Sequence, residues 1–363
     1  MNTAPVHVML PVEDYLPADY EGLRDPAMRL FNPSIQPLGE SYAAVYRVVT
    51  PGNDRRIAGC RLGPDFVPIP GSQVDISGLL APLMAGRSER SRGWFADPRI
   101  FALGGTFQMS WNDGFHYGAG DISPFNNQYL VELDRETLRP VGPVRAMVRD
   151  DGQSRPEKNW MLFDTPQGWR CVYEIGPHRV MEPVEKTDKT IVWRETRVAP
   201  NLSPYGETFG EFRGGAGPVE HGGAMYHFAH SAYAREGLRH YVANVYTFVP
   251  HAPYAVKRTV AEPFDLPRPD AIPDLETLND KAGEVLYVTG AVSRGKDWVL
   301  AYGVDDKIGC IVRVPKEEVE RRLTFRNNPS AWSALIAQAK LPVRRYLNRR
   351  KAAEARREHA AGD

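Results

Sequence analysis

One strand–turn–strand pattern recurs five times along the chain. Each copy has a small or polar residue, a short apolar run, a turn with Gly or Asp, and then a strand of apolar and aromatic residues. The positions that we take as equivalent are Asn32, Asp97, Asn159, Gly217 and Gly290, which are 65, 62, 58 and 73 residues apart. Such a period predicts repeated structural units rather than one continuous sheet.

Each interval between these positions holds roughly four strands of about 5–6 residues with their turns, which is the content of one propeller blade. Further strand-like runs lie between the hairpins, at residues 129–133, 191–193, 240–248 and 308–312. The 31 prolines and 32 glycines are spread evenly, which disfavours long helices before residue 315. We therefore predict an all-β fold, a five-bladed β-propeller over residues 27–315. A pair of β-sandwiches is the alternative.

The two ends of the chain differ from the repeat. Residues 1–26 are expected to form an N-terminal extension, and residues 316–363 a short, basic, helical C-terminal tail. In this tail, Ser330 is placed to cap a helix that Pro342 would interrupt. A solvated helix is the default expectation for the tail. A weak contact with a membrane surface, with phosphate or with an acidic protein is the alternative.

The composition bears on partners and compartment. The 45 basic and 45 acidic side chains balance, so no overall field attracts nucleic acid. Three widely spaced cysteines predict neither a disulfide framework nor a metal knuckle, which favours a reducing cytoplasm. The first 20 residues lack the features of a signal peptide, and no run of about 18 apolar residues indicates a transmembrane segment. The oligomeric state is left open.

Equivalent residues of a propeller meet around its axis because the inner strand of every blade begins there. The residues that would meet are Asn32, Asp97, Arg99, Lys158, Asn159, Arg213, Asp305 and Asp306. Asp97 leads this set, because the Asp-Pro-Arg sequence places a carboxylate at the head of a strand whose backbone Pro98 restrains. A carboxylic acid there can protonate a glycosidic oxygen if burial or a second carboxylate raises its pKa. The alternative is that Asp97 pairs with Arg99 or caps a turn.

A second cluster of candidate residues is basic. Arg155 and Lys158 precede one strand of a hairpin, and His178 and Arg179 follow the other strand. If the strands pair, these groups form a pocket of cationic donors that suits phosphate, a sugar phosphate or a nucleotide diphosphate. We expect no cofactor, with inorganic phosphate or a sugar phosphate as the substrate. Surface pairing with neighbouring glutamates is the alternative.

The glycine-rich run after Arg213 heads a strand rather than a helix, so it is not a nucleotide-binding loop. We expect its glycines to let a ligand approach the backbone. His227 and His230 lie three positions apart, so a strand places them on opposite faces and predicts packing rather than a metal site.

Two further sets of residues are candidates for contacts with sugar. Asp305 and Asp306 end a strand and are expected to bind sugar hydroxyls or to cap the turn. Trp160 and Tyr302 offer flat apolar faces to a sugar ring, and packing inside a blade is the alternative for both.

In the order of these motifs, the sequence resembles the five-bladed glycoside phosphorylases and hydrolases that act on β-mannosides, and the related propeller mannosyltransferases. The resemblance spans about residues 31–314. It rests on Phe31-Asn32-Pro33, Asp97-Pro98-Arg99, Lys158-Asn159 with His178, Gly215-Ala216-Gly217-Pro218, and Tyr302-Gly303-Val304-Asp305-Asp306.

The resemblance implies roles for individual residues. Asp97 would protonate the glycosidic oxygen, directly or through a substrate hydroxyl. The phosphate that attacks the anomeric carbon would be held by Arg155, Lys158, His178 and Arg179. Asn159 departs from the family pattern, because many relatives carry Asp there.

The sequence thus predicts a carbohydrate-active enzyme that cleaves or forms a glycosidic bond, in a mannoside and with inversion, like a phosphorylase or hydrolase. A glycosyltransferase that uses a sugar phosphate or a nucleotide sugar is the near alternative, because the same basic pocket would hold either donor. A glycan-binding propeller without catalysis is the second alternative. The enzyme prediction requires Asp97, Lys158 and His178 around one cavity, whereas the binding alternative requires an ion-paired, solvated Asp97.

Overall fold

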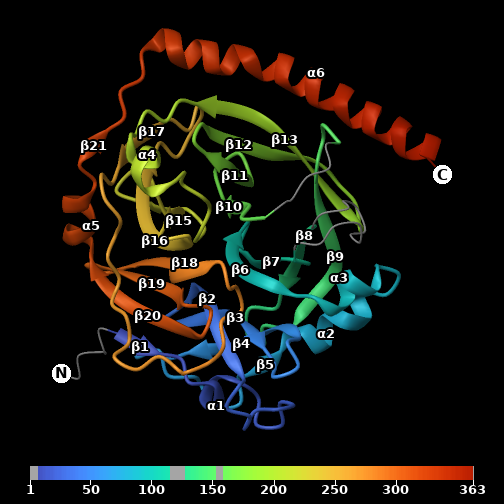
Figure 1. The fold of residues 1–363 in the computed structure, drawn as a ribbon, viewed down its shortest axis with the longest axis vertical. Helices are drawn as coiled ribbons and strands as arrows, with labels where there is room; N and C mark the ends of the chain where they lie inside the picture. Colours follow the sequence, from blue (N-terminus) through green and yellow to red (C-terminus); the bar gives the residue numbers. More distant parts are fainter. Residues whose placement is uncertain (1–6, 115–126, 153–157, 363) are drawn as a thin grey trace.

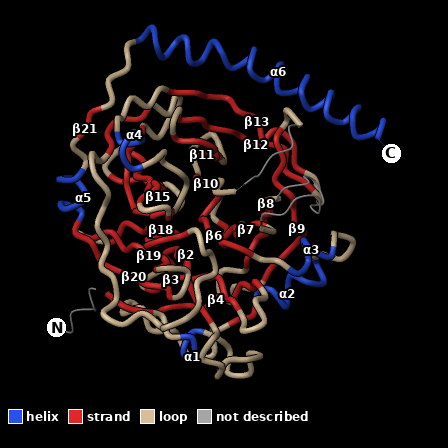
Figure 2. Tube along the Cα trace, viewed as in Figure 1, coloured by secondary structure: helices blue, strands red, loops and turns tan. Residues whose placement is uncertain are grey.

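The computed structural model describes residues 7–114, 127–152 and 158–362. Most of the regular secondary structure in this part of the chain is strand, and the helices lie at the periphery (Figure 2). A mostly-β fold with a C-terminal helix is therefore confirmed. Among the described helices, none has both the length and the apolar character that crossing a bilayer requires.

The strands follow one another in five antiparallel meanders. The first consists of β2 (Arg29–Leu38), β3 (Ser41–Val49), β4 (Arg55–Leu62) and β5 (Val74–Asp75). The second consists of β6 (Ala96–Leu103), β7 (Thr106–Asn112), β8 (Gln128–Leu133) and β9 (Pro140–Arg149). The third consists of β10 (Met161–Phe163), β11 (Arg170–Ile175), β12 (His178–Lys186) and β13 (Thr190–Ala199). The fourth and fifth consist of β14 (Val219–His221), β15 (Ala224–Arg235), β16 (Leu238–Phe248) and β17 (Val256–Thr259), and of β18 (Ala282–Arg294), β19 (Asp297–Val304) and β20 (Ile308–Pro315).

Figure 1 shows the meanders arranged in chain order around the middle of the molecule. The last meander lies beside the first, where Ile308 of β20 pairs in parallel with Leu30 of β2. Other neighbours are joined by parallel pairing of β9 with β13 and of β16 with β18. At the N-terminus, β1 (His7–Met9) adds a strand to β20, and α1 (Val12–Tyr15) follows it.

Strands that lie between two neighbours in a meander, such as β3, are buried on both faces, which explains their nearly continuous apolar sequences. In β3, the run from Tyr42 to Tyr46 is buried throughout. Large aromatic side chains fill the space between neighbouring meanders, among them the fully buried Trp111, Trp193 and Trp298. The five meanders therefore share packed interfaces and hold their inner strand ends in fixed relative positions.

Three of the repeat positions share an unusual backbone conformation. Asn32, Asp97 and Asn159 have φ angles of 51°, 50° and 60°. Asn and Asp tolerate this left-handed region better than other non-glycine residues do. The pairing of β2 with β3, and that of β6 with β7, is irregular at Asn32 and Asp97 respectively. The same local geometry thus recurs in three meanders, which supports their equivalence in the repeat.

Short helices lie outside the meanders: α2 (Ile76–Leu83), α3 (Glu89–Gly93), α4 (Tyr205–Phe209) and α5 (Lys316–Arg322). A short strand, β21 (Phe325–Arg326), precedes the long helix α6 (Ala331–Gly362). The hydroxyl of Ser330 accepts a hydrogen bond from the backbone N–H of Ser333, so the expected cap is present.

The expectation that Pro342 interrupts the C-terminal helix is wrong, because α6 continues through it. A proline removes one backbone hydrogen bond of a helix. Here Gln338 before it and Arg345 after it both bond to the backbone of β13. The sheet therefore supports the helix on both sides of the proline.

Candidate functional site

A cavity of about 160 Å³ lies where the inner strand ends of several meanders meet. It is lined by Asn32, Arg47, Asp97, Lys158, Asn159, Arg213, His230, Tyr241, Asn279, Ala282, Val285, Tyr287 and Asp306. These residues come from four of the meanders and from joining segments, among them Lys158 and Asn159 just before β10. The cavity is strongly polar, with two carboxylates and three permanent cations in its wall.

The sequence predicted that side chains from distant repeats would converge, and the structure brings six of them together. Asn32, Asp97, Lys158, Asn159, Arg213 and Asp306 all line this cavity. Asn32 and Asp97 are held at irregularities near the starts of β2 and β6. Arg213 is fixed by a pair of backbone hydrogen bonds with His230 of β15.

Asp97 accepts two hydrogen bonds at its Oδ1 atom. Nδ2 of Asn32 donates at 3.0 Å, and Nη1 of Arg47 donates at 3.1 Å. The side chain of Asp97 keeps 21% of its surface exposed, towards the cavity.

The charge around Asp97 determines its protonation. Burial raises its pKa, but Arg47, Arg99, Lys158 and the hydrogen bond from Asn32 outweigh burial, so the pKa lies below its ordinary value. The sequence argument required a raised pKa for a proton donor. The structure shows the opposite, because three cations surround one carboxylate.

Asp306 is the second carboxylate of the cavity and has the opposite shift. Burial raises its pKa, Asp97 raises it further, and Arg47 and Arg55 offset part of the rise. Asp306 lies in the turn between β19 and β20. The cavity therefore combines an ionised carboxylate with one that holds its proton more readily, an arrangement typical of acid–base sites.

Sequence reasoning missed a cluster of three arginines in the first meander, of which Arg47 lines the cavity. Arg29 and Arg55 are buried near Arg47, and burial together with Arg47 lowers the pKa of Arg55 to about 10. The guanidinium group of Arg47 lies 5.1 Å from the ring centre of Phe31. The signal was present in the sequence, because Arg47 interrupts an otherwise apolar strand. A charge within a buried strand indicates a polar partner inside the fold.

A second missed group consists of His230, Tyr241 and Tyr287. The Tyr287 hydroxyl donates to Oδ1 of Asn159 at 2.8 Å, and its ring packs edge-on against His230. Burial and nearby cations hold the pKa of His230 well below its ordinary value, so its ring is neutral at neutral pH. The prediction of simple packing holds for His227, which bonds to the Tyr246 hydroxyl. It is incomplete for His230, which also lines the cavity.

The expectation that the glycine-rich run lets a ligand approach the backbone is not supported by its surroundings. A Cβ atom on Gly214 would lie 2.5 Å from the backbone oxygen of Asn159. On Gly215 it would lie 2.7 Å from that of Val288. These glycines are required because strands of the protein itself pack against them.

His178 is not a phosphate ligand, and that expectation is wrong. Its ring is buried against Phe248, with Nδ1 2.9 Å from the backbone oxygen of Tyr254. Burial lowers its pKa to about 4, so the ring is uncharged at neutral pH. Asp97 and Lys158 share a cavity, as the enzyme prediction required, but His178 lies in the hydrophobic core.

The other two expected phosphate ligands differ in outcome. Arg179 pairs with Glu174 at 2.9 Å and lies near Glu195, so its charge is used within the third meander. It does not line the cavity that holds Asp97. Arg155 lies outside the described residues.

Four candidate sugar ligands contact other parts of the protein and do not line the cavity: Trp160, Tyr302, Asp305 and Arg99. Trp160 is fully buried against Tyr173 and Trp193. Tyr302 is also buried, and its hydroxyl donates to the backbone oxygen of Pro267 at 2.6 Å.

Asp305 accepts from Nη2 of Arg268, at 2.7 and 2.6 Å, and from the backbone N–H of Val285. Arg99 is buried beneath the site, where its Nε donates to the backbone oxygen of Gly215 at 2.7 Å. Arg99 therefore acts on Asp97 through its charge rather than through a position in the cavity wall.

A neighbouring cavity of about 210 Å³ extends the site towards β11. It shares Lys158, Asn159 and Arg213 with the first cavity and adds Tyr173 and Glu174. The shared residues place two cations between the two spaces. Within the described part of the chain, no three His, Cys, Asp or Glu side chains gather as a metal site would need.

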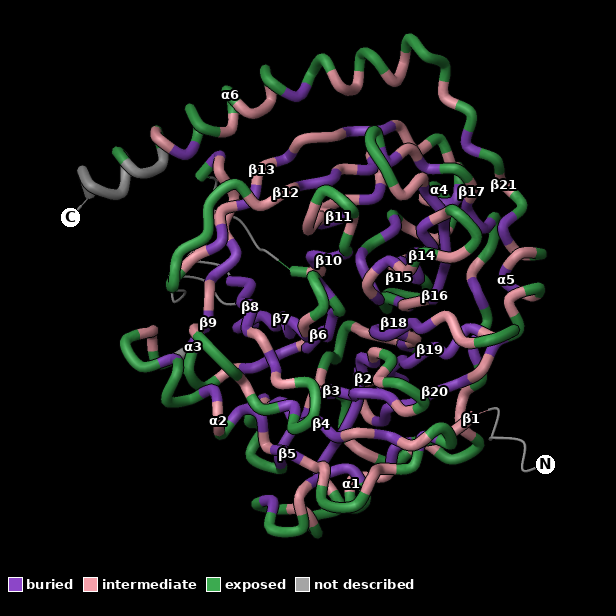
Figure 3. Tube along the Cα trace, turned by 180° about the vertical axis from the view of Figure 1, so that it is seen from behind, coloured by how far each residue is buried: buried purple, intermediate pink, exposed green. Residues whose placement is uncertain are grey.

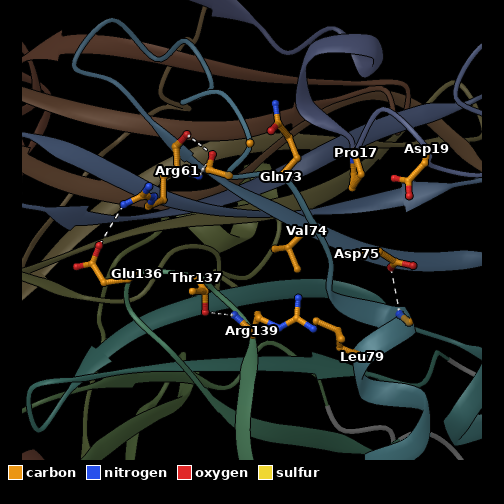
Figure 4. A pocket seen from close by; sticks show the side chains of 13 residues that line it. Pro17, Asp19, Arg61, Gln73, Val74, Asp75, Leu79, Glu136, Thr137 and Arg139 are labelled. Atoms are coloured by element: carbon orange, nitrogen blue, oxygen red, sulfur yellow. Dashed lines mark hydrogen bonds and ion pairs between the residues drawn. The ribbon is translucent and has the colours of Figure 1, made fainter.

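Another hollow, of about 570 Å³, lies at β4, β5 and α2 (Figure 4). Three of its charged side chains have partners within the protein. Arg61 pairs with Glu136 at 3.1 Å, and Asp75 caps α2 through the N–H of Gly78. The repeat positions Asn32, Asp97 and Asn159 line the central cavity and not this hollow.

No protein-family model matches the chain, and no curated protein matches it. The structure is similar to beta-1,2-mannobiose phosphorylase from Listeria innocua, with a TM-score of 0.53 and 14% identity over 89% of this chain and 99% of that chain. It is also similar to a glycosyl hydrolase from Bacteroides ovatus, with a TM-score of 0.51 and 14% identity over 80% and 84% of the two chains. These comparisons show a common fold, as the sequence resemblance led us to expect.

Proposed function

We propose that this protein is a five-bladed β-propeller enzyme that cleaves or forms the glycosidic bond of a mannoside. Five meanders in a ring support the propeller. The fold shared with beta-1,2-mannobiose phosphorylase supports the substrate class.

One observation carries the proposal: Asp97, Asp306 and the cations Arg47, Lys158 and Arg213 line a single cavity. Glycosidic bond cleavage needs an acid for the leaving oxygen and a nucleophile for the anomeric carbon. Lys158 and Arg213 would hold a phosphate oxyanion, since cationic donors suit phosphate oxygens. One phosphate oxygen would then bond to the anomeric carbon while the carbon–oxygen bond breaks and the leaving oxygen takes a proton. A single displacement of this kind inverts the anomeric carbon.

Asp97 is the proposed proton donor, and the anion prepares it for that role. Lys158 is one of the cations that lower the pKa of Asp97. A bound phosphate would offset the charge of Lys158 and so raise that pKa. Asp306 would accept hydrogen bonds from sugar hydroxyls in the same cavity.

The ion pair between Asp97 and Arg47 favours a second candidate, a propeller that binds glycans without catalysis. In that case Asp97 would remain ionised and would only accept hydrogen bonds from hydroxyls. A transferase would use the same cations for the phosphates of a sugar nucleotide. We further propose a cytoplasmic location, in keeping with the free, buried thiols of Cys60 and Cys310.

Product analysis separates these candidates. The protein would be incubated with β-1,2-mannobiose with and without phosphate, and with mannose 1-phosphate or GDP-mannose plus mannose as acceptor. Phosphate-dependent release of mannose 1-phosphate supports the phosphorylase. Release of mannose alone indicates a hydrolase, and release of GDP a transferase. Binding of mannobiose by calorimetry with no turnover of any donor would overturn the enzyme proposal in favour of the glycan-binding one.

A further inference from the structure

The helix α6 forms the outermost layer of the molecule, alongside β13 (Figure 1). Its inner side is tied to that strand. Gln338 donates to the backbone oxygen of Thr196 at 3.0 Å and accepts from the N–H of Val198 at 3.1 Å. Leu341 is buried beneath the helix. These contacts fix which side of α6 faces away from the protein.

The side of α6 that faces away is apolar from Trp332 to Leu347, and it ends at the exposed ion pair of Arg350 with Glu354. Figure 3 shows largely exposed and intermediate residues along the helix. The exposed fractions are 69% for Trp332, 58% for Leu335, 60% for Val343, 66% for Tyr346 and 46% for Leu347. At about 100° per residue, these positions fall on one arc of the helix surface. We call this arc the outer face.

The charge along the same stretch has one sign. Between residues 331 and 353 the chain has six lysines and arginines and neither aspartate nor glutamate. Arg344 and Arg349 turn back to pair with Glu195 and Asp150. Lys340 and Lys351 are exposed, at one border of the outer face. The outer face is therefore an exposed apolar strip with exposed cations beside it.

We propose that α6 lies in the plane of an anionic phospholipid bilayer, with its outer face in the boundary between headgroups and acyl chains. Apolar side chains on one face with Lys and Arg beside them are typical of helices that bind this boundary. Trp332 and Tyr346 suit it, because their rings are apolar and carry a polar atom at the edge. Lys340 and Lys351 would meet the lipid phosphates, whose charge is opposite.

Charge also decides against a second copy of the helix as the occupant. Two outer faces brought together would place like-charged lysines around a common apolar seam, and Glu354, the first acid of the helix, is already paired with Arg350. An anionic surface supplies the missing negative charge.

The test uses the full chain and sedimentation with vesicles of phosphatidylcholine, alone or mixed with phosphatidylglycerol. We expect binding to the mixed vesicles only, and its loss at high salt. Lys340→Glu with Lys351→Glu removes charge complementarity, and Trp332→Ala with Tyr346→Ala removes apolar contact. Either pair should weaken binding by about tenfold or more.

A matched control carries the same change of charge elsewhere. Arg24 and Lys296 are exposed and lie on other elements, so Arg24→Glu with Lys296→Glu should leave vesicle binding unchanged within about twofold. Equal weakening by this control would show a nonspecific charge effect and overturn the proposal. So would an absence of binding to mixed vesicles.

Self-association is a separate outcome. If the protein forms a concentration-dependent dimer by light scattering, does not bind vesicles, and loses the dimer in Trp332→Ala with Tyr346→Ala, the outer face would be assigned to self-association. Activity in the central cavity is not part of this test, so the two proposals fail independently.

Discussion

Asn32 donates a hydrogen bond from Nδ2 to Oδ1 of Asp97 at 3.0 Å, although 65 residues separate them. Both residues have a left-handed backbone, with φ of 51° and 50°, at corresponding places in the first and second meanders. The contact therefore joins two repeats at the point where their inner strands meet. It orients the carboxylate on which the proposed chemistry depends.

Replacing that carboxylate tests its role directly. Asp97→Asn keeps the shape of the side chain and the contact with Asn32 but cannot donate a carboxylic proton. We expect the rate of glycosidic bond cleavage to fall by about 10²–10⁴-fold. Asp164→Asn is the matched control, because Asp164 bonds at the surface to the N–H of Gly104. An Asp97→Asn enzyme with full activity would exclude Asp97 as the proton donor and leave Asp306 as the candidate.

Arg47→Met is expected to destabilise the fold, because it leaves Asp97 without its ion-pair partner. Asp97 has a lowered pKa, so its contribution to stability is present above its ordinary value of 3.8 and is lost as the pH falls through the folded pKa. The loss should therefore be about 1–3 kcal/mol at neutral pH and shrink in acid.

Chemical denaturation across pH measures the effect of Arg47→Met. Arg61→Met provides the comparison, since Arg61 pairs with Glu136, whose side chain is 72% exposed. Surface pairs contribute little, about 0–1 kcal/mol. Equal losses in the two variants, or a loss for Arg47→Met that does not change with pH, would contradict the electrostatic account.

Asp306→Asn should have the opposite effect on stability. The pKa of Asp306 is raised, so its contribution is fully present below 3.8 and is lost as the pH rises through the folded pKa. The Asn variant lacks this loss. Its stability relative to the wild type should increase from acid to neutral pH, as followed by thermal unfolding. Asp305→Asn, one residue earlier, should destabilise instead, because it weakens the bonds to Arg268.

From the sequence, we could predict those site residues that occupy equivalent positions of the repeat. Asn32, Asp97 and Asn159 were found because equivalent positions of repeated strands meet near one axis, and a repeat is visible without a structure. The mostly-β fold followed from the same pattern. Arg47 was missed because it lies on a second strand, away from the repeat position. Its break in the apolar pattern indicates a polar partner, but the contact with Asp97 is visible only in the structure.

His178 shows why the remaining residues could not be placed. The expected pairing of β11 with β12 does form, and it places His178 opposite Ile175. Successive residues of a strand point to opposite faces, however, and a register irregularity between Val172 and Glu174 decides which face each one takes. His178 faces the core, and Arg179 faces Glu174. Sequence spacing cannot locate such an irregularity.

Gly303 offers a test of the contact between Asn32 and Asp97 from a third position. A Cβ atom at residue 303 would lie 2.0 Å from Oδ1 of Asn32, so Gly303→Ala must displace that side chain. We expect a loss of about 1–3 kcal/mol in stability, together with reduced activity as Asp97 loses its orienting bond. Gly52→Ala is the control, since its nearest neighbour would lie 3.8 Å away.

A double-mutant cycle then decides whether the effect passes through Asn32. Asn32→Ala removes the atoms that the new methyl group would meet. If the clash is the cause, Gly303→Ala should cost much less stability in the Asn32→Ala background than in the wild type, a coupling of about 1 kcal/mol or more. Equal costs in the two backgrounds would show that residue 303 acts on the backbone alone. Activity that remained normal in Gly303→Ala would mean that Asp97 is held well enough by Arg47 without Asn32.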